Sequence, residues 1–320
     1  MKTAVVHSDP PKRKSTRFEA PSLLQRMWKH RILLLLLVPA LVWYGVFCYA
    51  PMYGNLIAFK AFSFKKGIWG SPWVGFSHFT KAFENADFWH VFFNQVIISV
   101  NMLILNFPLP ITIALLLNEV GKTRRKRFFQ TVYTFPHFIS WIVVASVFFN
   151  LLSSEGIVNQ VLTLFGVGSQ SLLMNPDTFR LFLYLTMAWK ESGWSAILYL
   201  AALTAIDPEL YNAAAIDGAG RWKQLLHITW PGIQSTAAIL LVLSAGNILS
   251  GGFDQIINLY NPAVRSVSDI VDTYIYRAAI LQGEDFGYTA AIGLFKSVIN
   301  LLMLVLANAS VKLLGEEGIF

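Results

Sequence analysis

The sequence of 320 residues contains a single cysteine, Cys48, which excludes an intrachain disulfide and cannot hold a metal site alone. Charged residues are also scarce, at 13%, whereas hydrophobic residues make up 55% and the mean hydropathy is +0.53. This balance excludes an ordinary soluble domain, because so few charges together with long apolar runs are typical of a membrane protein.

Signals of catalysis are missing as well. Gly121-Lys122-Thr123 is similar to the end of a phosphate-binding loop, but Leu116 occupies the position of the required first glycine. The Gly-x-Ser-x-Gly pattern is absent, and the six histidines show no metal-ligand spacing. We therefore expect no catalytic site, no metal site and no cofactor in this chain.

Apolar runs of about 20 residues, the length that crosses a bilayer core, recur along the chain. They predict an all-α membrane protein with six transmembrane helices, of which the last five form the compact part. A basic tail, residues 1–31, precedes the transmembrane domain, residues 32–320. The expected spans are 32–50, 93–117, 128–152, 179–203, 233–256 and 289–312.

Lysine and arginine are unevenly divided between the two sides of these spans. Sixteen lie in the tail, in the loop after the second span, in the loop 204–230 and at Lys312, whereas six lie in the intervening segments. Because basic residues favour the cytoplasmic side, both termini and the loop 204–230 are predicted to be cytoplasmic. The net charge of +7 then faces the anionic surface of the lipid bilayer rather than a nucleic acid.

The loop 204–230 has the pattern of a helix–turn–helix outside the bilayer. Asp207 is a good N-cap, and Pro208 follows at the first helical position. The first helix is expected to break at Asp217-Gly218, where glycine can adopt a positive φ. A second short helix should follow and end at Pro231. The alternative is a plain amphipathic helix lying on the membrane.

At these residues the chain resembles the "EAA" loop of permease subunits in binding-protein-dependent ABC importers. In that family the loop forms a coupling helix that sits in a groove of the cytoplasmic ATPase. Asn212 stands where the motif usually has glutamate, so a salt bridge to the ATPase at that point is not expected. The resemblance implies contact with the ATPase through Asp207, Asn212, Ala213, Ala214, Asp217, Gly218, Ala219, Arg221 and Trp222.

Polar groups within the spans are the second set of candidates, because charges at membrane depth usually face a cavity or another helix. Lys190 and Glu191 lie near the middle of the fourth span, and adjacent residues point about 100° apart on a helix, so they are not expected to pair. Aromatic faces beside polar groups suit a sugar. Alternatively, the charges are structural and the rings fill the core. The expected substrate path comprises Trp189, Lys190, Glu191, Trp194, Tyr199, Asn247 and Lys296.

The resemblance extends over roughly residues 25–320. Stretches such as 189–194, 252–255, 272–277 and 291–297 look like the LplB-type branch of carbohydrate-uptake permeases, to which alginate-importer permeases also belong. It implies a peripheral first helix and a five-helix core, paired with a second permease subunit and an ATPase dimer that binds ATP and Mg²⁺. It also implies an extracytoplasmic binding protein, which the outer segments 153–178 and 257–288 could receive, and alginate oligosaccharide as the leading substrate.

Two functions of other classes stay open at this point. An ion-coupled secondary carrier for sugars would use Lys190, Glu191 or Lys296 for ion coupling and would need no docking helix. A membrane-embedded enzyme acting on lipid-linked sugars would need a carboxylate or metal cluster, which the sequence does not suggest.

Overall fold

In the computed structural model the chain is helical, and the described residues are 28–121, 123–166, 168, 171–313, 315, 318 and 319. Within them the only extended pairing is an isolated bridge between Lys60 and Trp73. Most of the predicted basic tail and Lys122 lie outside the described residues. The chain divides into two compact units, residues 1–54 and 55–320.

The described part of the first unit is one nearly continuous helix. It comprises α2 (Arg31–Tyr44), the π-helical turn η1 (Gly45–Tyr49) and α3 (Ala50–Met52), which leads into a 3-10 helix. Its apolar side chains point outward all round, as expected for a helix surrounded by lipid. The predicted first span, 32–50, lies in this helix.

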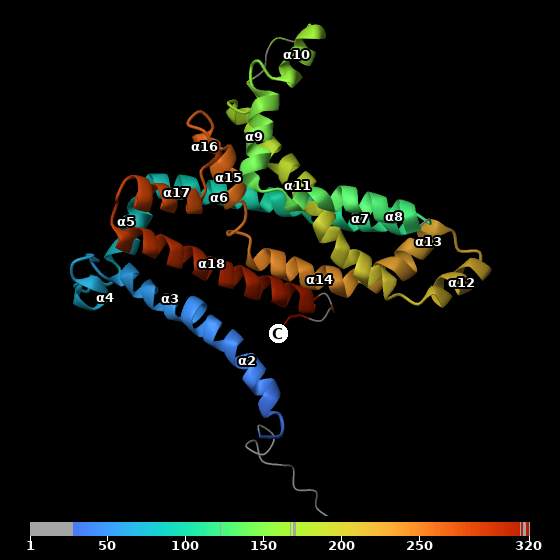
Figure 1. Cartoon of the computed structure of the whole chain (residues 1–320), viewed down its shortest axis with the longest axis horizontal. Helices are drawn as coiled ribbons and strands as arrows, with labels where there is room; N and C mark the ends of the chain where they lie inside the picture. The colour runs from blue at the N-terminus through green and yellow to red at the C-terminus, as the bar shows by residue number, and fades with distance from the viewer. Residues whose placement is uncertain are drawn as a thin grey trace, which may run out of the picture. The chain divides into compact units, whose positions relative to one another are not determined.

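The second unit contains the remaining helices, and in it the long α11 (Pro176–Thr204) lies among α6, α7, α8 and α14 (Figure 1). The other elements, in chain order, are η2 (Tyr53–Phe59), α4 (Gly67–Gly70), α5 (Ser77–Glu84), α6 (Ala86–Asn106), α7 (Pro108–Glu119), α8 (Thr123–Thr134), η3 (Phe135–Phe138), α9 (Trp141–Leu152), α10 (Ile157–Leu164), α12 (Pro208–Ile216), α13 (Arg221–Gln224), η4 (Leu225–Thr229), α14 (Trp230–Gly246), α15 (Phe253–Leu259), α16 (Arg265–Ser268), α17 (Val271–Tyr276), η5 (Arg277–Leu281) and α18 (Phe286–Leu313).

Two apolar clusters pack around the two halves of α11. Phe179 and Leu183 belong to the first, with residues of α6 and α15, and Leu200 and Leu203 belong to the second, with residues of α7 and α14. A third cluster joins α5, α6, α17 and α18 around Phe88. The middle of α11 therefore lies between two dry cores, and its polar residues are concentrated there.

Five helical stretches among the described residues are long and apolar enough to cross a membrane, namely 31–59, 86–119, 141–164, 221–246 and 286–313. The predicted fourth span, 179–203, is a continuous helix within α11, but it is not one of the five. It carries Arg180, Lys190 and Glu191, which reduce its hydropathy.

Three predicted boundaries are wrong. The run 128–152 is not one helix, because α8 ends at Thr134, a 3-10 turn follows, and α9 begins at Trp141. The fifth helix ends at Gly246, ten residues before the predicted end. Finally, Pro231 does not end the helix that starts at Arg221, since α13, η4 and α14 form one helical stretch through it. Proline lies near the start of α14, where its ring is tolerated.

The two basic loops of the second unit lie at the same end of it. The Arg221 side chain of the loop 204–230 donates from Nη1 to Oε2 of Glu119 at 3.1 Å, and Glu119 ends α7 just before the basic start of α8. Figure 1 shows α12 and α13 at this end, beside α7 and α8. This arrangement agrees with the charge rule that assigned both loops to one side of the membrane.

Candidate functional site

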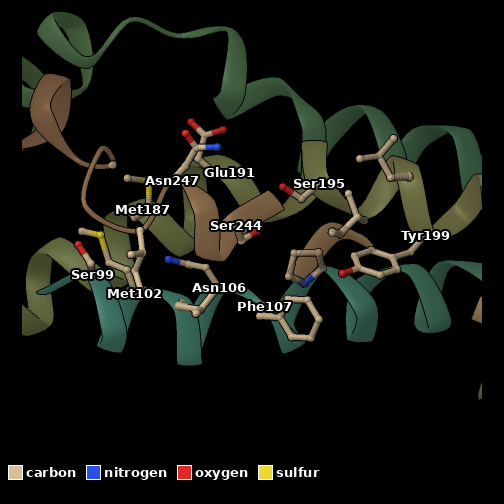
Figure 2. A pocket seen from close by; sticks show the side chains of 16 residues that line it. Ser99, Met102, Asn106, Phe107, Met187, Glu191, Ser195, Tyr199, Ser244 and Asn247 are labelled. Atoms are coloured by element: carbon tan, nitrogen blue, oxygen red, sulfur yellow. The ribbon is translucent and has the colours of Figure 1, made fainter. Parts of the chain in front are cut away.

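The middle of α11 borders a cavity of about 330 Å³ (Figure 2). Its walls come from the end of α6, the start of α7, the middle of α11 and the end of α14. Most of the lining is apolar, and a few polar side chains lie among the apolar ones, as in many small-molecule sites. The lining residues include Ser99, Asn106, Glu191, Ser195, Tyr199, Ser244 and Asn247, among methionines, leucines and Phe107.

Interrupted helices build this cavity. α6 ends at Asn106 and α7 restarts at Pro108, whose missing N–H and fixed φ favour a new start over a continued helix. α14 ends at Gly246, and the chain continues as turns to Gly252, which has a φ of +90°. In membranes, irregular backbone is tolerated where it lines a cavity or is buried in protein. The Oδ1 atom of Asn106 is buried without a partner in the described structure, so it is free to accept a hydrogen bond from a ligand.

A charged cluster lies beside the cavity at the middle of α11. The Lys190 ammonium donates to the backbone carbonyl of His137 at 2.7 Å and contacts Oε1 of Glu191 at 3.2 Å. The second carboxylate oxygen of Glu191 is 2.7 Å from Nδ1 of His137. The His137 ring stacks on Trp194, with centroids 4.6 Å apart and planes 4° apart. Lys190 is only 4% exposed, so these contacts replace its water.

The expectation that Lys190 and Glu191 would not pair is wrong. Their Cα–Cβ bonds diverge, but both side chains are long enough to bend toward the carbonyl and ring of His137, which lie on the same side of α11. Gly193 makes this approach possible, because a Cβ there would overlap the backbone carbonyl of Tyr133. The helix break at 135–140 therefore lies directly against α11.

The remaining residues of the predicted path occupy different places. Tyr199 and Asn247 line the central cavity with Glu191. Trp189 contacts Phe148 edge-on, with ring centroids 6.1 Å apart. Lys296 forms an ion pair with Asp272 of α17, at 2.5 and 2.6 Å, and does not line that cavity. The cavity thus brings together three of the seven residues.

A second cavity, of about 370 Å³, lies at the helix break itself. Its walls are residues 137–140 of the break, residues 141 and 142 at the start of α9, Lys190 of α11, and two polar residues of α15, Asp254 and Asn258. The Lys190 ammonium also lies 5.4 Å from the ring centroid of Trp141. The two cavities share the cluster as a wall, since Glu191 lines the first cavity while Lys190 and His137 line the second.

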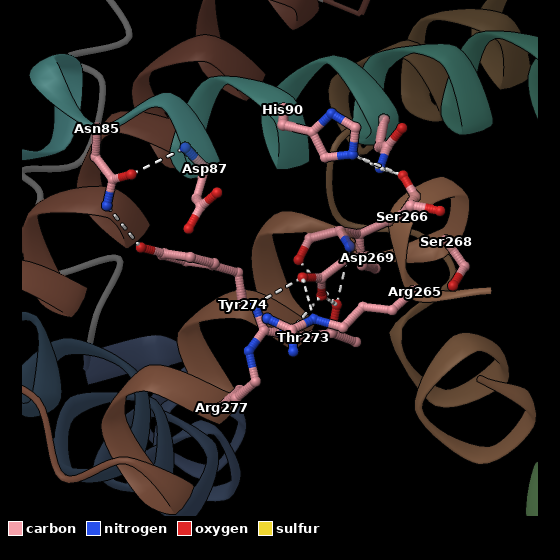
Figure 3. A network of polar contacts seen from close by, with 12 residues as sticks. Asn85, Asp87, His90, Arg265, Ser266, Ser268, Asp269, Thr273, Tyr274 and Arg277 are labelled. Carbon is pink, nitrogen blue, oxygen red and sulfur yellow. Dashed lines mark hydrogen bonds and ion pairs between the residues drawn. The ribbon is translucent and has the colours of Figure 1, made fainter. Parts of the chain in front are cut away.

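A separate ionic network lies near the start of α6 (Figure 3). Asp269, 3% exposed, accepts from Arg277 at 3.0 and 2.7 Å and from the hydroxyl of Thr273 at 2.7 Å. Burial lowers the pKa of Arg277, but the hydrogen bonds and charge of Asp269 outweigh it, so the pKa is raised. Burial and the 2.9 Å hydrogen bond with Tyr288 raise the pKa of Tyr274. The network holds α16 and α17 together.

The predicted helix–turn–helix is present in its first half. Oδ1 of Asp207 accepts from the N–H of Glu209 at 3.0 Å, which caps α12 as expected. Gly218 has a φ of +75°, and the helix stops there. No residue of α12 is buried, and Ile216 is 88% exposed. Trp222, just beyond the turn, is 78% exposed. The segment thus presents large apolar side chains that the described residues leave uncovered.

Residues 106–315 match the family described as "binding-protein-dependent transport system inner membrane component". The chain belongs to this family of transporter permeases. The match begins at the α6–α7 break and includes most residues of the central cavity, the charged cluster and the loop 204–230. Membership argues against the secondary carrier and the membrane enzyme, because the family consists of permease components of ABC transporters.

The permease is similar over nearly its whole length to two proteins of Bacillus subtilis (strain 168). It is 42% identical to the polygalacturonan/rhamnogalacturonan transport system permease protein YteP, with 93% of each chain covered. It is also 42% identical to Protein LplB, over 93% of this chain and 94% of that protein.

Two solved structures of ABC transporters are also similar to this permease. A chain of a bacterial ABC transporter involved in the import of the acidic polysaccharide alginate superposes with a TM-score of 0.83 and 36% identity, over 91% of this chain and 98% of that chain. A bacterial alginate ABC transporter in complex with an alginate pentasaccharide-bound periplasmic protein gives a TM-score of 0.84, also with 36% identity, over 93% and 99%. The permease fold is therefore shared with these transporters.

Sequence reasoning missed several residues of the two cavities. His137 is not among the predicted site residues, but it is the centre of the charged cluster. Asn106, Ser195 and Ser244 line the central cavity, although polar residues of these kinds often only bond across helices. Pro136, inside the run 128–152, was the local signal of the break, since proline disfavours a continuous helix.

Proposed function

We propose that this permease imports acidic oligosaccharides across the bacterial inner membrane, driven by separate ATPase subunits. The observation that carries the sugar-import part of the proposal is the central cavity, where the interrupted helices place hydroxyl, amide and carboxylate groups and the Tyr199 ring among apolar side chains. Such a lining suits a sugar, because the few polar groups can bond its hydroxyl groups while the apolar and aromatic side chains contact its C–H faces.

Several relatives support the acidic substrate class. One is named for polygalacturonan and rhamnogalacturonan, and two solved transporters carry alginate. Polygalacturonan and alginate are both chains of uronic acids, and alginate oligosaccharide is our leading candidate for this chain. The buried Lys190 ammonium supports a negatively charged substrate, because it supplies the only cation beside the two cavities among the described lining residues.

We propose α12 and the turn after it as the contact with the ATPase. Its first half is a capped helix with no buried residue, and Ala213 and Ala214 let a partner approach closely. Exposed apolar side chains such as Ile216 and Trp222 are typical of a protein interface. Movement of this segment would be transmitted to α14, because α13 continues into it as one helical stretch.

The assembly that this function requires has four kinds of component. A second permease subunit would complete the path, and an ATPase dimer would bind ATP and Mg²⁺. An extracytoplasmic binding protein would deliver the substrate to the outer segments 153–178 and 257–288. The complex of a related alginate transporter with a periplasmic protein supports this last partner.

The experiment is ATP hydrolysis by the assembled complex in proteoliposomes, with binding protein and size-matched acidic or neutral oligosaccharides. We expect stimulation by uronate oligomers. Stimulation by neutral glycans alone would retain the importer but exclude the acidic substrate. Uptake that follows an ion gradient and needs no ATPase would instead support the secondary carrier.

A further inference from the structure

The break between α8 and α9 is the least expected feature of the fold, because it interrupts an apolar run that would otherwise cross the membrane. Non-helical backbone at membrane depth leaves carbonyl groups without helical partners, and these must be satisfied by protein or by water in a cavity. Here the carbonyl of His137 receives the Lys190 ammonium at 2.7 Å. Residues 137–140 of the break form part of the wall of the second cavity.

We propose that this second cavity is a binding subsite for one uronate residue, with Lys190 as the partner of the sugar carboxylate. The inference rests on the proposed function and names a site within it. The cavity, about 370 Å³, lies within the range of about 300–1,000 Å³ that small-molecule sites occupy. Its charged groups differ in sign, with Lys190 on α11 and Asp254 on α15.

This division of charge orients a bound sugar. A carboxylate is attracted to Lys190 and repelled by Asp254, so it should face α11. Sugar hydroxyls can donate to the Asp254 carboxylate and to the amide oxygen of Asn258, whose Nδ2 already donates to the backbone carbonyl of Asp254 at 2.7 Å. A neutral sugar would find the same hydroxyl partners but would gain nothing from the ammonium.

Lys190 can bind a substrate carboxylate because its ammonium has three N–H donors, of which the carbonyl of His137 and Oε1 of Glu191 engage two. Glu191 can also release the ammonium, because it has a second partner. Glu191 uses one oxygen for Lys190 and the other for Nδ1 of His137, at 3.2 and 2.7 Å. When a uronate carboxylate takes the ammonium, Glu191 keeps the contact with His137, which the stacked Trp194 ring holds in place. The exchange therefore leaves no buried charge without a partner, the condition that makes such rearrangements costly.

The central cavity does not offer this chemistry. Glu191 is the only charged residue among its described lining residues, so a carboxylate there meets a like charge. The two cavities should consequently differ in selectivity. The second favours the acidic form of a sugar, and the first accepts its hydroxyl groups.

The test measures access to each cavity in the assembled complex, without the binding protein, so that the permease alone discriminates. Ile142, 65% exposed, lines the second cavity, and Ser244 lines the first. In a Cys48→Ala background, Ile142→Cys or Ser244→Cys would be labelled with a water-soluble maleimide. Labelling would be timed with alginate tetrasaccharide or with the same oligomer after reduction of its carboxyl groups.

We expect the acidic oligomer to protect Ile142→Cys at a concentration about tenfold lower than the reduced oligomer, the factor that one charged hydrogen bond represents. Lys190→Met should remove this difference and Lys190→Arg should preserve most of it. Equal protection by both oligomers would overturn the subsite. That comparison is made with Lys190 present, so it does not depend on whether Lys190→Met folds.

Failure of the subsite and failure of the importer are separable. Equal protection together with ATP-driven uptake of acidic oligomers would remove the subsite and keep the proposed function. Protection confined to Ser244→Cys would also overturn the subsite, because it would place the sugar in the central cavity alone. Loss of ATP-driven uptake for every oligomer would instead contradict the proposed function.

Discussion

At the scale of one residue, Asp269 shows how burial determines the contribution of an ion pair to stability. Its side chain and that of Arg277 are only 5% and 10% exposed. Asp269→Asn keeps the shape but leaves the arginine charge without a counter-ion, which should destabilise the protein by about 3–5 kcal/mol. We expect a clear fall in the unfolding temperature of the complex in detergent.

The matched control is Glu119→Gln. It also removes one carboxylate from an arginine, but the Glu119 and Arg221 side chains are 60% and 87% exposed. Water solvates both ions when they separate, so the expected loss is at most about 1 kcal/mol. If both substitutions lowered the unfolding temperature equally, burial would not be the cause.

Lys190 and Glu191 show what a sequence does not reveal at this scale. The two residues point about 100° apart on the helix, yet they pair because both side chains contact His137, more than 50 positions earlier. A pairing that depends on a third residue from a distant segment cannot be predicted from helix geometry alone. The N-cap of Asp207, in contrast, depends only on residues two positions away, and it is confirmed.

At the scale of an element, the turn after α12 depends on one backbone conformation. Gly218 has a φ of +75°, whereas Gly220 has an ordinary φ of −68°, and an added Cβ meets nothing within 4 Å at either position. Gly218→Ala therefore tests backbone strain alone, at about 1–2 kcal/mol. We expect ATP-driven uptake to fall about 5–30-fold if all of that strain opposes the coupling movement.

Gly220→Ala serves as the control for this turn, because it adds the same methyl group two residues later without a positive φ. It should leave uptake near that of the unaltered protein, and both variants should insert into the membrane equally. Equal uptake by the two variants would show that the turn does not control coupling. A bulky charged group at Ala214 is expected to abolish transport through a different route, by blocking the approach of the ATPase.

Apolar runs predict where helices lie, but they do not report where a helix is interrupted. The spans at 179–203 and 289–312 lie within α11 and α18, because nothing in those runs opposes a helix. The run 128–152 is divided at Pro136, and the fifth helix ends at Gly246 although apolar residues follow. Both differences occur where tertiary packing offers a polar cavity. The interruptions are therefore the parts of the fold that carry the proposed site.

At the scale of the whole molecule, the orientation of the second unit remains a prediction from charge. The coupling segment must be cytoplasmic for an ATPase to reach it, and the segment 55–75 must then lie outside. Phe64 and Ile216 are suitable reporters, at 76% and 88% exposed. In a Cys48→Ala background, a membrane-impermeant maleimide added to right-side-out vesicles should label Phe64→Cys and spare Ile216→Cys. Inside-out vesicles should give the reverse.

This experiment separates the charge argument from the family relationship. The excess of lysine and arginine on one side predicts the orientation through their preference for the cytoplasmic face, without reference to any relative. Arg124 and Arg125 lie at the same end of the second unit as Arg221, so one reporter determines the side of the membrane for all three. Labelling of Ile216→Cys from outside would place these charges beyond the membrane. It would then contradict both the orientation and the assignment of α12 to a cytoplasmic ATPase, whatever the similarity to other permeases.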